Sequence, residues 1–253
     1  MTELAPRAAE LASEMDLGSL EGVLAALRDE ASDRRTARRV IERRLRGSQA
    51  TALLALFDSN DFEVALAAIS GAARSAALVR QQLGATGLVW TGPESRTLSV
   101  RPTRAVVVEL IARARSSLTL VTYAGHDIAD LVEDLDRARL EREVEVRIIL
   151  ETRLDTVDGR GPDPATALKH LPLAVTIYRW PKEQRGTKGG SMHVKCVVRD
   201  RVDALVTSAN LTSAALDRNM ELGLLVEGGT VARTIEQHFD DLIDGGVLLR
   251  VAQ

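Results

Sequence analysis

The chain has 253 residues, of which 45% are hydrophobic and 27% are charged, and its formal net charge is −3. That charge excludes a uniformly basic nucleic-acid binder, and an aromatic content of 3% argues against a stacking platform for single strands. The single cysteine cannot form an internal disulfide, and no signal peptide or long apolar span is evident, so we expect a cytoplasmic protein without a membrane partner.

Residues 1–85 are predicted to form an all-helical N-terminal domain. Runs of alanine, leucine, arginine and glutamate are interrupted there only by Pro6 and single glycines. The expected helices span residues 4–14, 17–30 and 32–45, and two more are expected between residues 59 and 83. Asp33 or Ser32 is expected to cap the third helix.

The third predicted helix carries a stripe of arginines. On a helical wheel, Val40 and Ile41 mark the apolar half, and such a helix would dock by that half and expose guanidinium groups suited to phosphate. The candidate nucleic-acid-binding residues in this stripe are Arg34, Arg35, Arg38 and Arg39. The alternative is a solvated face paired with the acidic residues of the first two helices.

Residues 86–253 show short β-rich runs that alternate with helical patterns, which predicts an α/β domain. The expected strands are residues 88–90, 118–123, 144–150, 174–178, 192–198, 204–206, 222–226 and 247–251. The expected helices are residues 103–115, 127–142, 164–171 and 230–243. Tyr123 stands at the end of the second expected strand.

A loop at residues 181–190 precedes the expected strand at 192–198. Its three cations, Lys182, Arg185 and Lys188, are candidate contacts for a polyanionic substrate. The alternative is a mobile surface connection.

The most informative pattern of the chain follows this loop and consists of His193, Lys195, Asp200, Ser208, Asn210 and Glu221. On a strand, residues two apart share a face, so His193 and Lys195 should project together while Val194 packs on the other face. A polar turn would send the chain back and bring Ser208 and Asn210 toward them. Imidazole, ammonium, hydroxyl and amide groups at one point predict an anion site with a nucleophile. The alternative is a buried hairpin, but a lysine directed into apolar surroundings is costly without an anionic partner.

This spacing resembles the HKD motif of the phospholipase D superfamily, and residues 219–223 resemble the segment that supplies the family's carboxylate. Thr207 stands where many members have glycine. The resemblance covers residues 86–253 and implies a phospholipase D-like layered α/β/α domain with a mixed sheet. It also implies covalent catalysis, in which one histidine attacks phosphorus and another protonates the leaving oxygen, with no metal or other cofactor.

By this resemblance, His193 would be the nucleophile or the general acid. Lys195, Ser208 and Asn210 would bind the non-bridging oxygens, and Glu221 would orient the imidazole. Asp200 falls in the turn between the strands and is assigned a supporting, structural role.

Only one copy of the motif is present, because His126, His170 and His238 do not repeat its spacing. A site with two histidines therefore requires a second chain, which predicts a homodimer with the site on its two-fold axis. A weaker alternative uses His126 as the second histidine.

The helical front end followed by a single motif is further similar to phospholipase D-like components of bacterial anti-phage defence systems. This similarity implies a nuclease that acts on nucleic acid, with other defence-system proteins as candidate partners. Two alternatives stay open: a non-catalytic nucleic-acid-binding or adaptor component of a defence complex, and a lipid phosphodiesterase.

Overall fold

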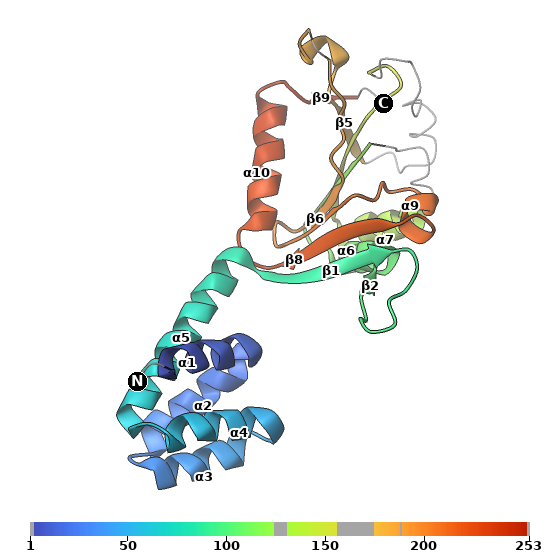
Figure 1. The fold of residues 1–253 in the computed structure, drawn as a ribbon. Helices are drawn as coiled ribbons and strands as arrows, with labels where there is room; N and C mark the ends of the chain where they lie inside the picture. Colours follow the sequence, from blue (N-terminus) through green and yellow to red (C-terminus); the bar gives the residue numbers. More distant parts are fainter. Residues whose placement is uncertain (1–2, 124–130, 156–174, 188, 252–253) are drawn as a thin grey trace. The chain divides into compact units, whose positions relative to one another are not determined.

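The computed structural model describes residues 3–123, 131–155, 175–187 and 189–251 (Figure 1). The chain divides into two compact units, Met1–Gln82 and Leu83–Gln253. The expected boundary at residues 85 and 86 falls just beyond this division. The expected helix at residues 164–171, together with His126, His170 and Lys188, lies outside the described residues.

The first unit contains the helices α1 (Leu4–Glu14), α2 (Leu17–Glu30), α3 (Arg34–Arg44), α4 (Gly47–Asp58) and α5 (Phe62–Leu83). The first three were predicted, and Asp33 caps α3 by accepting a hydrogen bond from the amide of Thr36 at 2.8 Å. The expectation of two helices between residues 59 and 83 was wrong, because one helix of 22 residues runs through Gly71. A glycine in the middle of a helix lowers the stability of the helix by about 1 kcal/mol, and burial of apolar side chains elsewhere in α5 offsets this cost. Helix α4 was not predicted, since no side chain caps its first turn.

Helix α5 is long and apolar enough to meet a membrane-span criterion, with a mean hydropathy of 1.4. The helix meets this criterion by its length and composition alone. Its residues Phe62, Ala65, Leu66, Ile69 and Ala73 are buried in the apolar core of the helical unit.

The second unit is built on one nine-stranded sheet, in the order β2-β1-β8-β7-β6-β3-β4-β5-β9. Its elements are β1 (Ala85–Thr91), β2 (Arg101–Pro102), α6 (Thr103–Arg113), β3 (Ser117–Thr122), α7 (Val132–Arg142), β4 (Glu145–Leu150), β5 (Thr176–Arg179), η2 (Lys182–Gln184), β6 (Cys196–Arg199), β7 (Asp203–Thr207), α9 (Ser213–Asp217), β8 (Glu221–Glu227), α10 (Val231–Asp244) and β9 (Leu249–Arg250). The strands β3, β4 and β5 are parallel to one another, whereas β3–β6, β6–β7 and β7–β8 pair antiparallel. The predicted mixed sheet is therefore confirmed, and β2 and α9 were too short to give a periodic signal.

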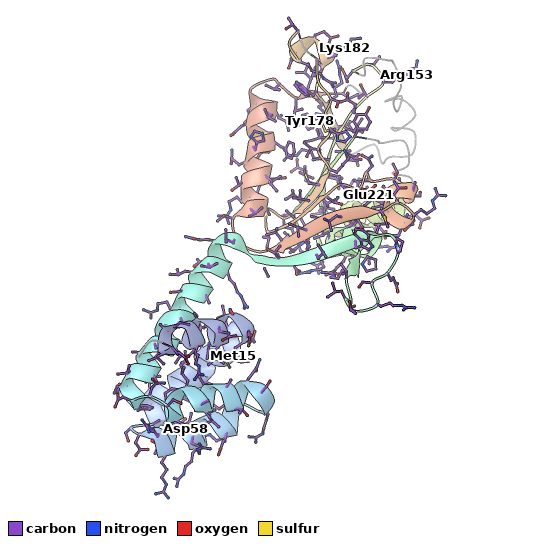
Figure 2. All side chains as sticks on the ribbon, in the orientation of Figure 1. Met15, Asp58, Arg153, Tyr178, Lys182 and Glu221 are labelled. Atoms are coloured by element: carbon purple, nitrogen blue, oxygen red, sulfur yellow. The ribbon has the colours of Figure 1, made fainter. Side chains whose placement is uncertain are left out.

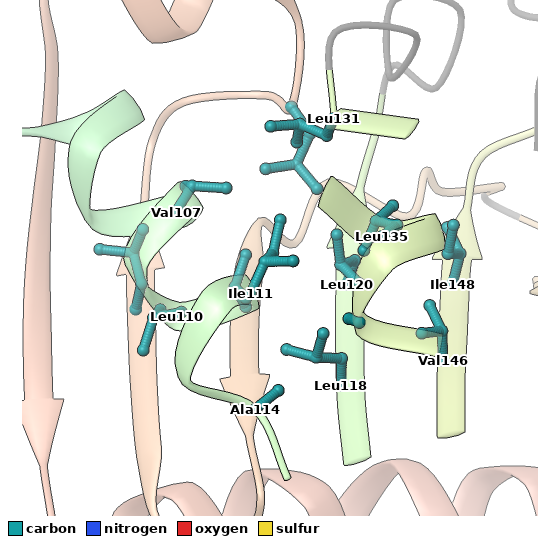
Figure 3. Close-up of a cluster of buried hydrophobic side chains, with 14 of the residues drawn as sticks. Val107, Leu110, Ile111, Ala114, Leu118, Leu120, Leu131, Leu135, Val146 and Ile148 are labelled. Atoms are coloured by element: carbon teal, nitrogen blue, oxygen red, sulfur yellow. The ribbon is translucent and has the colours of Figure 1, made fainter. Parts of the chain in front are cut away.

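Helices cover both faces of this sheet. On one face α6 and α7 pack on β3 and β4, and Figure 3 shows Ile111 and Leu135 of these helices close to Leu120. On the other face Phe239 of α10 packs in a cluster that includes Cys196. Burial raises the pKa of the Cys196 thiol to about 12, which keeps it protonated. The layered α/β/α architecture follows from these two apolar interfaces.

Candidate active site

Four strand ends meet at one end of the sheet. Because β6 pairs antiparallel with both β3 and β7, the start of β6 lies beside the ends of those two strands. The start of β8 lies there too, since β7 and β8 are antiparallel, and Figure 2 shows Glu221 at that start. This geometry collects the predicted site residues His193, Lys195, Ser208, Asn210 and Glu221 in one region.

The expected strand at residues 192–198 is shorter than predicted and begins only at Cys196. Its last partner on β3 is Val121, and β3 ends at Thr122, so the residues before Cys196 have no neighbouring strand on that side. Instead the amide of His193 bonds to the carbonyl oxygen of Ser191 at 3.0 Å. The expectation that Val194 packs on the opposite face of a strand was also wrong, because the strand begins after it and this residue is 48% exposed.

Lys195 is the buried cation of the site, with only 6% of the residue exposed. Its Nζ donates a hydrogen bond to the carbonyl oxygen of His193 at 2.9 Å and lies 5.7 Å from the centre of the Tyr123 ring. Burial lowers the pKa of the Lys195 ammonium, and attraction to the Glu221 carboxylate opposes that shift. A partly desolvated charge of this kind interacts strongly with an incoming anion.

The imidazole of His193 lies against the side chain of Tyr123, with ring centres 5.2 Å apart, and the residue is exposed. Among the side chains that the structure describes, none forms a hydrogen bond with this imidazole. An accessible ring on an aromatic support is suited to reach a phosphorus atom.

Glu221 is engaged by neighbours other than His193. Its carboxylate accepts hydrogen bonds from the hydroxyl of Ser208 at 2.5 Å and from the amide of Asn219 at 3.2 Å. The Ser208 hydroxyl in turn accepts from the amide of Leu222 at 3.1 Å. The role of Glu221 as the orienting partner of His193 therefore stays a prediction.

Asn210 is held from the end of β3. The hydroxyl of Thr122 donates to the side-chain oxygen of Asn210 at 3.4 Å and accepts from the amide of Leu211 at 3.1 Å. Thr207, the departure from the family pattern, pairs with Gly223 and needs no positive φ. A Cβ added to Gly223 would lie 3.0 Å from the Cβ of Thr207, so the glycine at position 223 makes room for this threonine.

Asp200 lies at the far end of β6, where its geometry matches the supporting role expected of it. Its carboxylate accepts from the backbone amides of Arg115, Ser116 and Ser117 at 2.7–3.1 Å. Burial acts to raise the pKa of this carboxyl, but those amide hydrogen bonds outweigh it and lower the pKa. Asp200 therefore fastens the β6–β7 turn to the start of β3.

The assignment of Arg185 to substrate binding was wrong. Its guanidinium is buried and forms a bidentate ion pair with Glu151, at 2.7 and 2.9 Å. Sequence reasoning missed Glu151, although a carboxylate directly after the buried strand β4 was a usable signal. Lys182 is exposed on η2 (Figure 2) and remains a candidate contact, while Lys188 lies outside the described residues.

The arginines of α3 are all exposed, as the stripe required. Several are also paired: Arg38 with Asp58 at 2.6 Å, and Arg43 and Arg44 with Glu30 of α2. Arg39 makes no ion pair within the part of the unit that the structure describes. The alternative of pairing with the acidic first two helices is thus realised at Arg43 and Arg44, whereas phosphate binding by the other arginines stays a prediction.

In the described ranges, no group of three or more histidine, cysteine, aspartate or glutamate side chains could hold a metal ion.

Comparisons with known proteins agree with this geometry. A model of the family "Cardiolipin synthase, PLD-like domain" matches residues 107–243. The DISARM protein DrmC of Bacillus paralicheniformis is 28% identical over 156 residues, which are 59% of this chain and 60% of that protein. The match therefore spans less than two thirds of the length of that curated relative.

Two solved structures share the fold of the second unit. Nuc from Salmonella typhimurium, a phospholipase D family member, superposes with a TM-score of 0.50 at 19% identity, covering 67% of this chain and 99% of Nuc. NucT from Helicobacter pylori gives a TM-score of 0.51 at 16% identity, covering 65% of this chain and 98% of NucT. Since the family model matches more than half of the chain, over the strands and loops that form the site, the protein belongs to the PLD-like domain family of the phospholipase D superfamily.

Proposed function

We propose that this protein is a metal-independent phosphodiesterase, a nuclease, whose active site is shared by two copies of the chain. The observation that supports it most is the cluster at one end of the sheet, where Lys195 bonds to an exposed His193 and feels the charge of Glu221, which in turn bonds to Ser208. A nucleophilic imidazole beside a buried ammonium suits attack on an anionic diester.

The proposed reaction has two balanced steps. The imidazole of His193 attacks phosphorus, an N–P bond forms, and the P–O bond to the leaving group breaks as the imidazolium of the second copy's His193 protonates that oxygen. Water then attacks the phosphohistidine while the now neutral second imidazole takes its proton, and the N–P bond breaks. Lys195, Ser208 and Asn210 would stabilise the non-bridging oxygens throughout.

A second copy is needed to supply the other imidazole, and one surface supports its binding. Five side chains, each 44–52% exposed, form what we term the apolar strip: Leu88, Val194, Val206, Leu222 and Leu224. Register places Leu224 between Leu88 and Val206 on adjacent strands. Figure 1 shows β1 and β8 side by side. Helix α10 packs beside the strip, over β6 and β7, and lines a cavity together with Val194 and Val206. Exposed apolar patches of this kind mark interaction surfaces, and Val194 brings this one next to His193.

Nucleic acid is the proposed substrate. Lys182 and the exposed arginines of α3 supply positive charge for a phosphate backbone. Similarity to DrmC, described as a DISARM protein, supports a role in bacterial anti-phage defence alongside other proteins. We further propose that the protein acts in the cytoplasm, where it would encounter nucleic acid.

The test is cleavage of DNA and RNA by the full chain in excess EDTA. We expect cleavage that His193→Ala abolishes, whereas His238→Ala, which removes an exposed histidine of α10 that lines a cavity beside His193 but belongs to no motif, should leave it intact. Inhibition by EDTA would overturn the metal-independent mechanism. Tight binding without any cleavage would point to the non-catalytic binding component instead.

One observation favours a lipid phosphodiesterase as second candidate. A cavity of about 590 Å³ opens beside His193 and is lined mainly by apolar side chains, among them Met192, Val206 and Phe239. It could hold an acyl chain next to the scissile phosphate. Release of headgroup from phospholipid vesicles, dependent on His193, would establish this activity over the nuclease.

A further inference from the structure

A buried ion pair lies directly behind the segment that carries His193. Glu151 follows β4, Arg185 follows η2, and their side chains are 1% and 2% exposed. Burying two charges costs several kcal/mol for each ion unless the remaining hydrogen-bonding capacity is satisfied. Arg185 satisfies its own capacity by donating to the carbonyl oxygens of Trp180, Asp155 and Gly190, the last at 2.8 Å.

The pair also reaches the chain on the other side of the loop. The Oε2 of Glu151 accepts a hydrogen bond from the backbone amide of Met192 at 3.1 Å, one residue before His193. Arg185 and Glu151 therefore hold the backbone at residues 190 and 192, immediately before the imidazole. The guanidinium also stacks over the Trp180 ring, 4.9 Å from its centre, which fixes its plane.

His193 depends on such support because the sheet does not supply it. The β6 ladder begins at Cys196 opposite Val206, and the carbonyl of Lys195 accepts one further bond, from the amide of Thr207. Within the described residues, the amide of His193 bonds only inside its own turn, to Ser191, and not to a neighbouring strand. What holds residues 190–192 therefore helps to set the position of the imidazole, together with the Lys195 hydrogen bond and the Tyr123 ring.

We propose that Glu151 and Arg185 are positioning residues that fix the imidazole of His193 against the scissile phosphate. The inference rests on the proposed phosphodiesterase activity. An apolar pair could fill the same space, but it would leave the amide of Met192 and the carbonyl of Gly190 without partners. The two parallel hydrogen bonds between Arg185 and Glu151 fix the relative orientation of the two side chains as well as their distance. Such precise placement is needed to position a reactive group and is not needed to anchor a surface loop.

The experiment compares Arg185→Lys with a matched variant, Arg199→Lys. Arg199 forms a largely buried pair with Asp203, with side chains 12% and 2% exposed, but at the opposite end of β6, away from His193. Both substitutions keep the charge, lose the planar fork and should lower the melting temperature. We expect Arg185→Lys to lower kcat by about 10- to 100-fold with little change in KM, since a displacement of about 1 Å can cost 100-fold. Arg199→Lys should leave kcat within about twofold of wild type.

A second readout does not require catalysis. The chain has four histidines, so their imidazole NMR signals can be assigned individually. We expect Arg185→Lys to shift or broaden the His193 signal and leave that of His238 unchanged, and Arg199→Lys to change neither. If Arg185→Lys does not fold, Glu151→Gln tests the same point, because it removes the charge while keeping an oxygen near the Met192 amide.

An unaltered His193 signal and kcat in folded Arg185→Lys would overturn the positioning role, as would an equal loss of kcat in Arg199→Lys. A wild-type chain without activity on any phosphodiester would instead refute the proposed function. The NMR comparison would then still decide whether the ion pair positions the imidazole.

Discussion

The Nζ of Lys195 lies 2.9 Å from the backbone carbonyl oxygen of His193 and donates a hydrogen bond to it. The two residues that define the motif are therefore tied to each other directly, before any substrate binds. The bond also orients the ammonium toward the region of Tyr123 and Glu221. The proposed role of Lys195 in binding an anion requires its ammonium to remain charged in surroundings that disfavour the charge.

We predict that Lys195→Met abolishes activity and stabilises the fold. Burial lowers the pKa of Lys195 below its ordinary value of 10.5. Between the lowered pKa of the folded state and 10.5, the unfolded chain therefore binds more protons than the folded chain. The buried charge destabilises the folded state at lower pH, and this lost stability is regained as the pH rises through that range. We expect the melting temperature to rise at pH 7 and activity to fall by at least about 100-fold.

The stability gain of Lys195→Met should shrink as the pH rises toward 10.5 and vanish well above it, where the wild-type lysine is neutral in both states. Lys182→Met, at an exposed position, is the matched control and should leave the melting temperature unchanged. Calorimetry across this pH range makes the measurement. A lower melting temperature for Lys195→Met at pH 7 would contradict the prediction.

Asp200→Asn should destabilise the protein without changing the rate of the folded enzyme. The carboxylate accepts hydrogen bonds from three backbone amides. Replacing it with the neutral side chain of asparagine should lower the free energy of unfolding by about 2 kcal/mol, because the charge-assisted hydrogen bonds are lost. The pKa of Asp200 is lowered from 3.8, so its contribution is complete above that pH and is lost as the pH falls through the folded pKa. The difference between wild type and variant in urea unfolding should therefore narrow below pH 4.

A suitable control is Asp217→Asn, which removes a surface ion pair with Arg104 at 2.6 Å. Exposed pairs contribute less than about 1 kcal/mol. Loss of turnover in folded Asp200→Asn would show that this residue acts in catalysis and would refute its structural role.

Arg39→Gln should weaken binding to nucleic acid uniformly across sequences. Removing one cation that neutralises a phosphate lowers the slope of log affinity against log salt by about 1. Arg39 makes no ion pair among the described side chains of the helical unit, whereas Arg43 is already neutralised by Glu30. Binding measured at several salt concentrations should therefore show a reduced slope for Arg39→Gln and not for Arg43→Gln. Identical slopes for both variants and wild type would contradict the proposal that α3 binds nucleic acid.

The residues of the site could be predicted from the sequence because their chemistry lies within a short stretch. His193, Lys195 and Ser208 are separated by one hairpin, whose polar turn and β-branched flanks are local signals. The limit of β6 could not be predicted in the same way, because it depends on where β3 ends, at Thr122.

Burial of charged side chains depends even more on distant residues. Arg185 appeared to be a loop cation, and only Glu151, 34 residues earlier in the chain, makes it an interior residue. The single helix α5 illustrates the converse, since Gly71 suggested an interruption that packing of the helical core overrides. Local pattern located the candidate residues, whereas tertiary contacts decided which charged side chains are buried and which are exposed.

The last prediction concerns the apolar strip. We expect Leu224→Glu both to separate the two copies and to abolish cleavage. Leu224 lies at the centre of the strip, 47% exposed, so its substitution leaves the core of the monomer intact but places a charge where the second copy would bind. Light scattering should give twice the chain mass of 27.4 kDa for wild type and the single mass for the variant. Leu140→Glu, a 66% exposed position on α7, on the other face of the sheet, should stay dimeric and active. Because each site needs both imidazoles, mixed dimers of wild type and His193→Ala should also be inactive. A Leu224→Glu monomer that still cleaves would mean that one chain suffices, and it would refute the shared site.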